Sequence, residues 1–139
     1  MSEPRSWTLQ IDGFDPLSLN DRGHWSKHRQ LKAEWRTEVG WLAKQQRIPR
    51  LRRIRVDLHA YPATNRRRDA DNLVATLKPC IDGLRDADVI VDDTPDHVTF
   101  SPPTIHPSRC GGLPVHQRRW SWELVVTELP DVDDVEPAA

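Results

Sequence analysis

One stretch of the chain, residues 65–98, most constrains the fold. Three arginines, Arg66, Arg67 and Arg68, are followed directly by the sequence D-A-D-N-L, with two aspartates one residue apart. Apolar residues then recur three and four positions apart, which predicts an amphipathic helix; they are Leu73, Leu77, Ile81 and Leu84. The apolar run at residues 89–91 predicts a short buried strand after that helix. The stretch therefore predicts a helix that packs on a sheet.

Helix signals surround the aspartate pair. Asp71 and Asn72 are residue types favoured at helix N-termini, so Asp71 is expected at or near the cap. Asp69 then falls at the end of a strand or loop. Pro79 lies inside the helical pattern and is expected to kink or divide the helix, because proline has no backbone donor.

A second aspartate pair, Asp92 and Asp93, follows the predicted strand at residues 89–91. Carboxylates at the exit of a strand and at the start of a helix can converge, and Mg²⁺ prefers such oxygen ligands. Each motif also has a structural explanation: aspartates cap helices or lie in solvated turns, and arginines lie in solvated loops. Their occurrence together favours a divalent metal site beside a phosphate-binding basic strip.

The combined motifs resemble the RusA family of Holliday-junction resolvases. The motifs are R-R-R-D-A-D-N-L, then K-P-x-x-D-G-L, then V-D-D. D-P-L-S-L-N near the start and R-R-W-S-W-E-L-V-V-T-E-L near the end also resemble that family. The resemblance covers about residues 6–129. It implies a small single-domain α/β (α+β) fold with a mixed sheet and two main helices.

The resemblance also implies an activity. A protein of this family is expected to be a Mg²⁺-dependent endodeoxyribonuclease, with Mn²⁺ as an alternative ion. It is expected to act as a homodimer and to resolve four-way junction DNA by paired nicks in recombination and repair. By motif, the catalytic and metal-binding aspartates are Asp69, Asp71 and Asp93, with Asp92 as an alternative ligand.

One position departs from the family pattern. Family members often carry a catalytic lysine one turn after the second aspartate, where this chain has Ala75. Lys78 lies three residues further on, hence on a similar face of the predicted helix. We expect Lys78 to take the catalytic role.

Predicted DNA contacts come from two places. Arg66, Arg67, Arg68 and Asn72 are expected to bind the DNA backbone. Asn20, with His24 and Trp25, lies in a predicted loop and is a candidate for contacting the backbone or a flipped or stacked base. The structural alternative is that Asn20 closes a turn and Trp25 packs on the core.

Charge is divided unevenly along the chain. The net charge is −1, but residues 1–68 carry +8 and residues 69–139 carry −9. A basic half can meet phosphates while an acidic half supplies metal ligands. The chain has 139 residues, which predicts one nuclease domain at residues 1–129, and the acidic residues 130–139 predict a disordered tail.

Several features narrow the class of protein. No apolar run is long enough to span a membrane and no secretory leader is seen, so a cytoplasmic protein is expected. No glycine-rich phosphate loop is present, so no nucleotide cofactor is indicated. Two alternatives to a nuclease stay open: a DNA-binding module without catalysis, and a metal-dependent phosphohydrolase of small molecules.

The remaining elements are predicted from periodicity. Alternation predicts strands at residues 7–11, 54–61, 98–105 and 120–128, the third of them limited by Pro102 and Pro103. Ser26 is the expected N-cap of a long helix at residues 27–46. Its apolar stripe is Leu31, Trp35, Val39 and Leu42, and Trp41 falls off that stripe.

Overall fold

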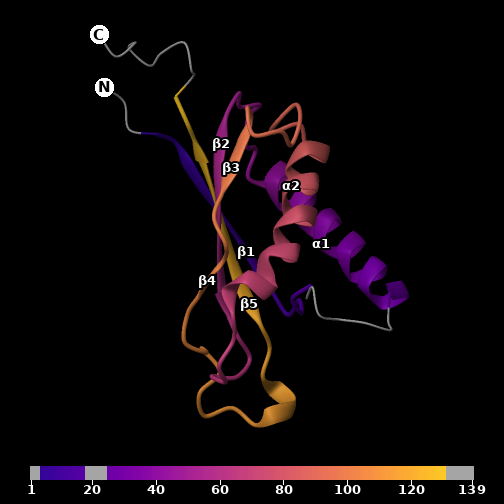
Figure 1. Cartoon of the computed structure of the whole chain (residues 1–139), viewed down its shortest axis with the longest axis vertical. Coiled ribbons are helices and arrows are strands. Elements are labelled where there is room, and N and C mark those ends of the chain that lie inside the picture. Colours follow the sequence, from indigo (N-terminus) through magenta and orange to yellow (C-terminus); the bar gives the residue numbers. More distant parts are fainter. Residues whose placement is uncertain (1–3, 18–24, 131–139) are drawn as a thin grey trace.

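The computed structural model describes residues 4–17 and 25–130 (Figure 1). One mixed sheet of five strands and two helices form a small mixed α/β domain, which confirms the predicted fold class. The elements are β1 (Ser6–Asp12), α1 (Trp25–Gln45), β2 (Ile54–Tyr61), the 3₁₀ helix η1 (Ala70–Thr76), α2 (Leu77–Asp86), β3 (Val98–Phe100), β4 (Thr104–Ile105), the 3₁₀ helix η2 (Val115–Gln117) and β5 (Ser121–Glu128). Asn20, His24 and the tail from residue 131 lie outside the described residues.

The sheet has the order β1-β5-β2-β3, with β4 also paired to β2. β5 is antiparallel to both β1 and β2, whereas β3 and β4 run parallel to β2. Pro102 and Pro103 separate β3 from β4, as expected for residues that interrupt a strand ladder. The four predicted strands 7–11, 54–61, 98–105 and 120–128 are therefore found, the third in two pieces.

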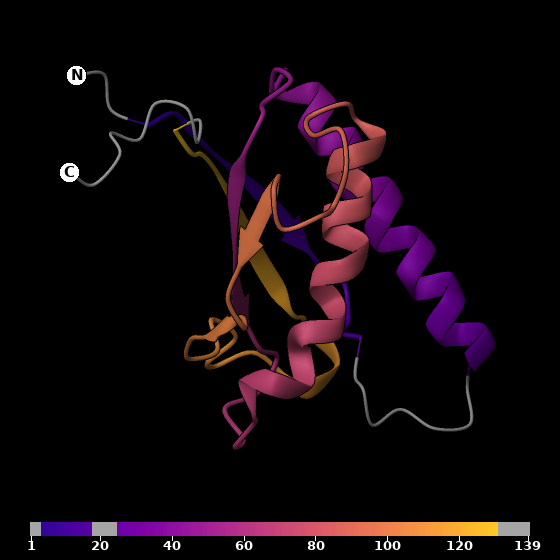
Figure 2. The same ribbon diagram turned by 45° about the horizontal axis from the view of Figure 1, so that its top comes forward.

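Both helices cover the same face of the sheet (Figure 2). Alternate residues of β2 are buried beneath them, from Ile54 to Ala60, because side chains of a strand alternate between its two faces. Trp35 of α1 meets Trp122 of β5 edge to face, with the ring centroids 5.1 Å apart. This aromatic contact joins the helical layer to the centre of the sheet.

Helix α1 begins at Trp25, so Ser26 lies inside the first turn and is not the cap that the sequence predicted. Its predicted apolar stripe is confirmed: Trp35 and Val39 are fully buried and Leu31 and Leu42 pack at the edge of the core. Trp41 falls off the stripe and is 57% exposed.

The predicted second helix is divided into η1 and α2. Asp69 is the N-cap of η1: its backbone is extended and its Oδ1 accepts a hydrogen bond from the Asp71 amide at 3.1 Å. Asp71, predicted at or near the cap, is the second residue of η1. Pro79 is the third residue of α2, where a helix has no intrahelical partner for the amide that proline lacks. The boundary between the two helices, at Thr76 and Leu77, places the proline without loss of a hydrogen bond.

The strand predicted at residues 89–91 is wrong. Val89 and Ile90 are buried, but Val91 is 58% exposed and the segment joins no ladder. Its backbone is held through a hydrogen bond from the Leu51 amide to the Val89 carbonyl. Asp88 has a positive φ of 62°, which turns the chain sharply before the apolar run and prevents extended pairing. The periodicity signalled burial correctly but not a strand.

Candidate functional site

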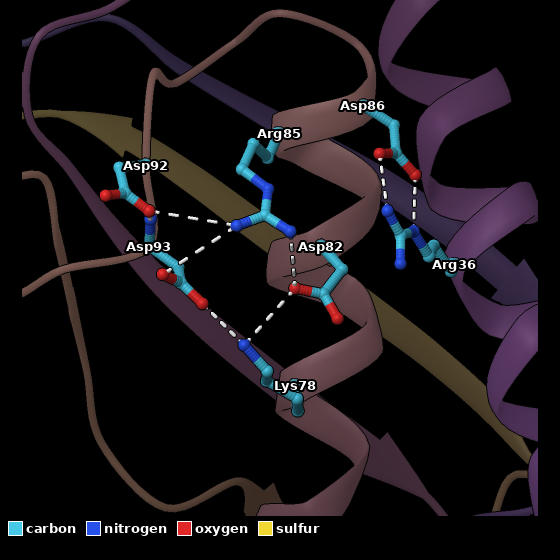
Figure 3. A network of polar contacts seen from close by, with 7 residues as sticks. All are labelled: Arg36, Lys78, Asp82, Arg85, Asp86, Asp92 and Asp93. Carbon is cyan, nitrogen blue, oxygen red and sulfur yellow. Dashed lines mark hydrogen bonds and ion pairs between the residues drawn. The ribbon is translucent and has the colours of Figure 1, made fainter.

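Five charged side chains gather between α2 and the segment that follows it (Figure 3). Lys78 donates from Nζ to Asp93 Oδ2 at 2.5 Å, and the same ammonium lies 3.3 Å from Asp82 Oδ1. Asp93 belongs to the loop after α2, so this contact pins that loop to the helix. Lys78 and Asp93, two of the predicted catalytic residues, are thereby brought together.

Arg85 completes this cluster from the next turn of α2. Its guanidinium lies 3.7 Å from Asp92, 3.9 Å from Asp93 and 3.7 Å from Asp82. Two cations thus face three carboxylates, which leaves one negative charge in excess. Asp92 and Asp93, the predicted aspartate pair, thus both form ion pairs with cationic side chains of the protein.

Asp82 was not predicted as a site residue. It is only 6% exposed, and its Oδ1 has no hydrogen-bond partner among the described residues, although two cations lie at ion-pair distance. A buried carboxylate is costly unless cations offset it. The sequence did carry a signal: Lys78, Asp82 and Arg85 are spaced four and three apart and so share one helix face.

The cluster shifts the pKa values of its members in a consistent direction. The hydrogen bond from Lys78 lowers the pKa of the Asp93 carboxyl, and the hydrogen bond to Asp93 raises the pKa of the Lys78 ammonium. Each group therefore stays charged over a wider range of pH than it would alone.

Arg66, Arg67 and Arg68 lie outside this charged cluster, in the segment that leads into η1. No carboxylate of a described residue pairs with the guanidinium of Arg66 or Arg67. Arg68 differs, because it donates to the Thr64 carbonyl at 2.6 Å and the Arg66 carbonyl at 3.0 Å. It also lies over the ring of Trp120, 4.9 Å from the centroid. Arg66 and Arg67 are thus available to an anion, and Arg68 fixes the loop.

An open pocket of about 450 Å³ unites most of the predicted DNA-binding residues. Its lining residues are Pro16, Arg66, Arg67, Arg68, Asp69, Asn72, Leu73 and Trp120. The arginines, Asn72 and Asp69 therefore line one pocket, whereas Lys78 of α2 and Asp93 of the loop after it belong to the separate charged cluster. Trp120 was predicted only as the start of a strand; its place beside the arginines depends on tertiary packing that no local pattern signals.

The predicted metal ligands fit Mg²⁺ in chemistry but are not assembled. Carboxylate oxygens suit this ion, and Asp69 and Asp71 are exposed to solvent. Asp93, however, is engaged by Lys78 and Arg85. Within the described ranges, no three His, Cys, Asp or Glu side chains form a group that could hold a metal ion. Metal binding by all three aspartates would require Asp93 to leave the cluster.

The residue at the position of the family's catalytic lysine, Ala75, has no group that could take that role. Ala75 is partly buried and packs against the hydrophobic core. Lys78, the predicted substitute, has its ammonium on Asp93 and Asp82. Asn20 cannot be placed, because it falls in the gap between the described ranges.

Comparison with known proteins gives no further assignment. No protein-family model and no curated protein matches the chain. None of the described helices is both long enough and apolar enough to cross a membrane.

Proposed function

We propose that this protein is a Mg²⁺-dependent, structure-selective endodeoxyribonuclease that resolves Holliday junctions by paired nicks in DNA recombination and repair. The observation that carries the proposal is the pocket in which Arg66 and Arg67 adjoin the carboxylate of Asp69, and neither arginine pairs with a carboxylate of residues 4–17 or 25–130. Arginines attract a phosphate, and a neighbouring carboxylate suits a metal that acts on that phosphate. The resemblance of the motifs to RusA resolvases supplies the DNA substrate.

The residues have distinct roles in this proposal. Arg66 and Arg67 bind the DNA backbone, and Arg68 holds their loop in place. Asp69, Asp71 and Asp93 are the residues that would hold Mg²⁺, or Mn²⁺ in its place. When bound, such an ion supplies Lewis-acid chemistry to a phosphodiester.

Lys78 and Asn72 also have roles in the proposal. Its ammonium is held at the edge of the carboxylate cluster and would offset the charge that develops on the scissile phosphate. Asn72 lines the pocket and is a further contact to the DNA backbone.

A homodimer is part of the same proposal. Two sites related by two-fold symmetry can nick two like strands of a junction that is itself nearly two-fold symmetric. The proposal further places the protein in the cytoplasm and requires no nucleotide cofactor.

The test is cleavage of a synthetic four-way junction beside a linear duplex of the same sequence, with Mg²⁺, Mn²⁺ or EDTA. Asp71→Asn should keep junction binding and lose cutting, because it removes a carboxylate charge at an exposed position. Asp57→Asn is the matched control, because Asp57 pairs with Arg55 within strand β2 and does not line the pocket. This substitution should leave cutting unchanged. If Asp71→Asn loses binding along with cutting, Asp71 has a structural role and the assignment fails.

A DNA-binding module without catalysis is the second candidate. The specific observation in its favour is that Asp93 is held by Lys78 and Arg85, while Ala75 replaces the expected lysine. Tight binding of the junction with no cutting in either metal would establish this alternative.

A further inference from the structure

The loop at residues 106–120 lies at the same end of the sheet as the segment 62–69 that carries the arginines (Figure 1). The Ser108 amide donates to Asn65 Oδ1 at 2.6 Å, and the Ser108 hydroxyl donates to the Ala63 carbonyl at 3.2 Å. These bonds join the 106–120 loop to the segment that leads into the arginines. Two stretches about forty residues apart in sequence therefore form one surface.

This shared surface is strongly basic. No aspartate or glutamate occurs between His97 and Trp122, or between Leu58 and Arg68. Arg109 pairs with Glu123, but no carboxylate of a described residue pairs with Arg118 or Arg119. The loop thus adds two uncompensated positive charges to those of the pocket, although it belongs to the acidic half of the sequence.

The loop is braced from within. Arg118 donates from Nε to the Leu113 carbonyl at 2.9 Å, and Arg119 donates from Nη1 to the His116 and Arg118 carbonyls, both at 2.9 Å. A guanidinium has five N–H donors, so each arginine keeps donors for an external anion. The Cys110 thiol also donates to the Arg119 carbonyl at 3.2 Å, which ties the two ends of the loop together.

Apolar side chains stand at the tip of this basic loop. Val115 is 78% exposed and Leu113 is 42% exposed, so both are among the few large apolar side chains of the described chain that face solvent. Apolar side chains flanked by arginines are typical of proteins that insert a wedge between bases while binding the adjacent phosphates. Interrupted stacking at a branch point lowers the cost of such insertion.

We propose that the 106–120 loop is a second DNA-binding element. Arg118 and Arg119 contact backbone phosphates, and Val115 packs on bases exposed where the duplex is interrupted. The inference rests on the proposed function for its ligand, and it names the part of the protein that distinguishes branched from linear DNA.

The test measures binding of a four-way junction and of a matched duplex over a range of salt concentrations, in EDTA. Each phosphate contact contributes about 0.9 to the slope of log K against log salt. The double variant Arg118→Gln/Arg119→Gln should therefore make this negative slope shallower, reducing its magnitude by roughly one to two units. Glutamine keeps a donor for the internal carbonyl bonds, and circular dichroism checks that the variant folds.

Two further variants sharpen the result. Lys44→Gln removes one charge in the last turn of α1, remote from the 106–120 loop, and should leave the slope unchanged (Figure 1). Val115→Ser removes the apolar tip without removing charge. It should lower the preference for junction over duplex while the salt slope stays constant.

The outcomes separate this inference from the proposed function. If Arg66→Gln/Arg67→Gln lowers the slope and Arg118→Gln/Arg119→Gln does not, the loop is not a DNA-binding element, although the proposed function stands. An unchanged junction preference in Val115→Ser overturns the role of the tip. If the unaltered protein binds neither DNA, the proposed function fails and this inference fails with it.

Discussion

The close contact between the two helices makes Gly83 sensitive to even a small substitution. A Cβ atom at Gly83 would lie 2.5 Å from the carbonyl oxygen of Arg36 and 3.0 Å from the amide nitrogen of Gly40. Both neighbours are backbone atoms, so rotation of a side chain cannot relieve these contacts. Gly83→Ala therefore forces α1 and α2 apart.

Two opposing effects set the size of the change. Relief requires a shift of roughly 0.5–1 Å, which forfeits about a quarter to a half of each contact across the helix pair, and overpacking of this kind costs about 1–3 kcal/mol. Alanine regains up to about 1 kcal/mol of helix propensity over glycine. Because the obstruction is backbone, we place the cost near its upper limit and expect a net loss of about 2 kcal/mol.

Urea unfolding followed by tryptophan fluorescence measures this loss, since Trp35 and Trp122 are fully buried. The control is Gly111→Ala, where a new Cβ meets no atom within 4 Å and no loss is expected. A Gly83→Ala protein as stable as the unaltered protein would refute the argument, because helix propensity would then outweigh the contact between the helices.

The charged cluster and the buried thiol give three more predictions. Because Lys78 lowers the pKa of the Asp93 carboxyl, the pair stabilises the fold above the ordinary aspartate pKa of about 3.9, and this stability is lost as the pH falls through the lowered value. In EDTA, acidification from neutral pH should therefore destabilise the Lys78→Met variant less than it destabilises the unaltered protein. An equal loss of stability in both proteins would contradict this. Arg85→Met should lower the free energy of unfolding by about 1 kcal/mol, a value reduced because Arg85 is partly exposed, since Asp82 loses one of its cations. Adding Asp82→Asn to this variant should restore much of the lost stability in a double-mutant cycle. Burial raises the pKa of the Cys80 thiol, so a thiol reagent should find one reactive cysteine of the two until the protein unfolds.

The elements with strong periodicity could be predicted from the sequence. The alternation in residues 54–61 gave β2 with its bounds, and the stripe of α1 gave the buried Trp35 and Val39. Both patterns report which face of an element is buried, and burial controls these segments. The apolar run at residues 89–91 shows the limit: it is mostly buried, but the turn at Asp88 keeps it from pairing as a strand.

The candidate site was predicted only in part, for a related reason. Arg68, Asp69 and Asn72 are close in sequence, so their common pocket follows from local chain geometry. The ion pair of Lys78 with Asp93 depends on the path of the loop after α2, and the contact of Arg68 with Trp120 depends on β5. Such contacts arise from the packing of distant segments, which spacing within one motif does not encode.

The most direct test of the central claim is a map of the cuts made in a four-way junction whose strands are labelled one at a time. The account predicts two symmetric nicks in like strands, in the presence of Mg²⁺ and not of EDTA, with the matched linear duplex left intact. Cutting of the linear duplex at an equal rate, or no cutting in any metal despite tight binding, would contradict it.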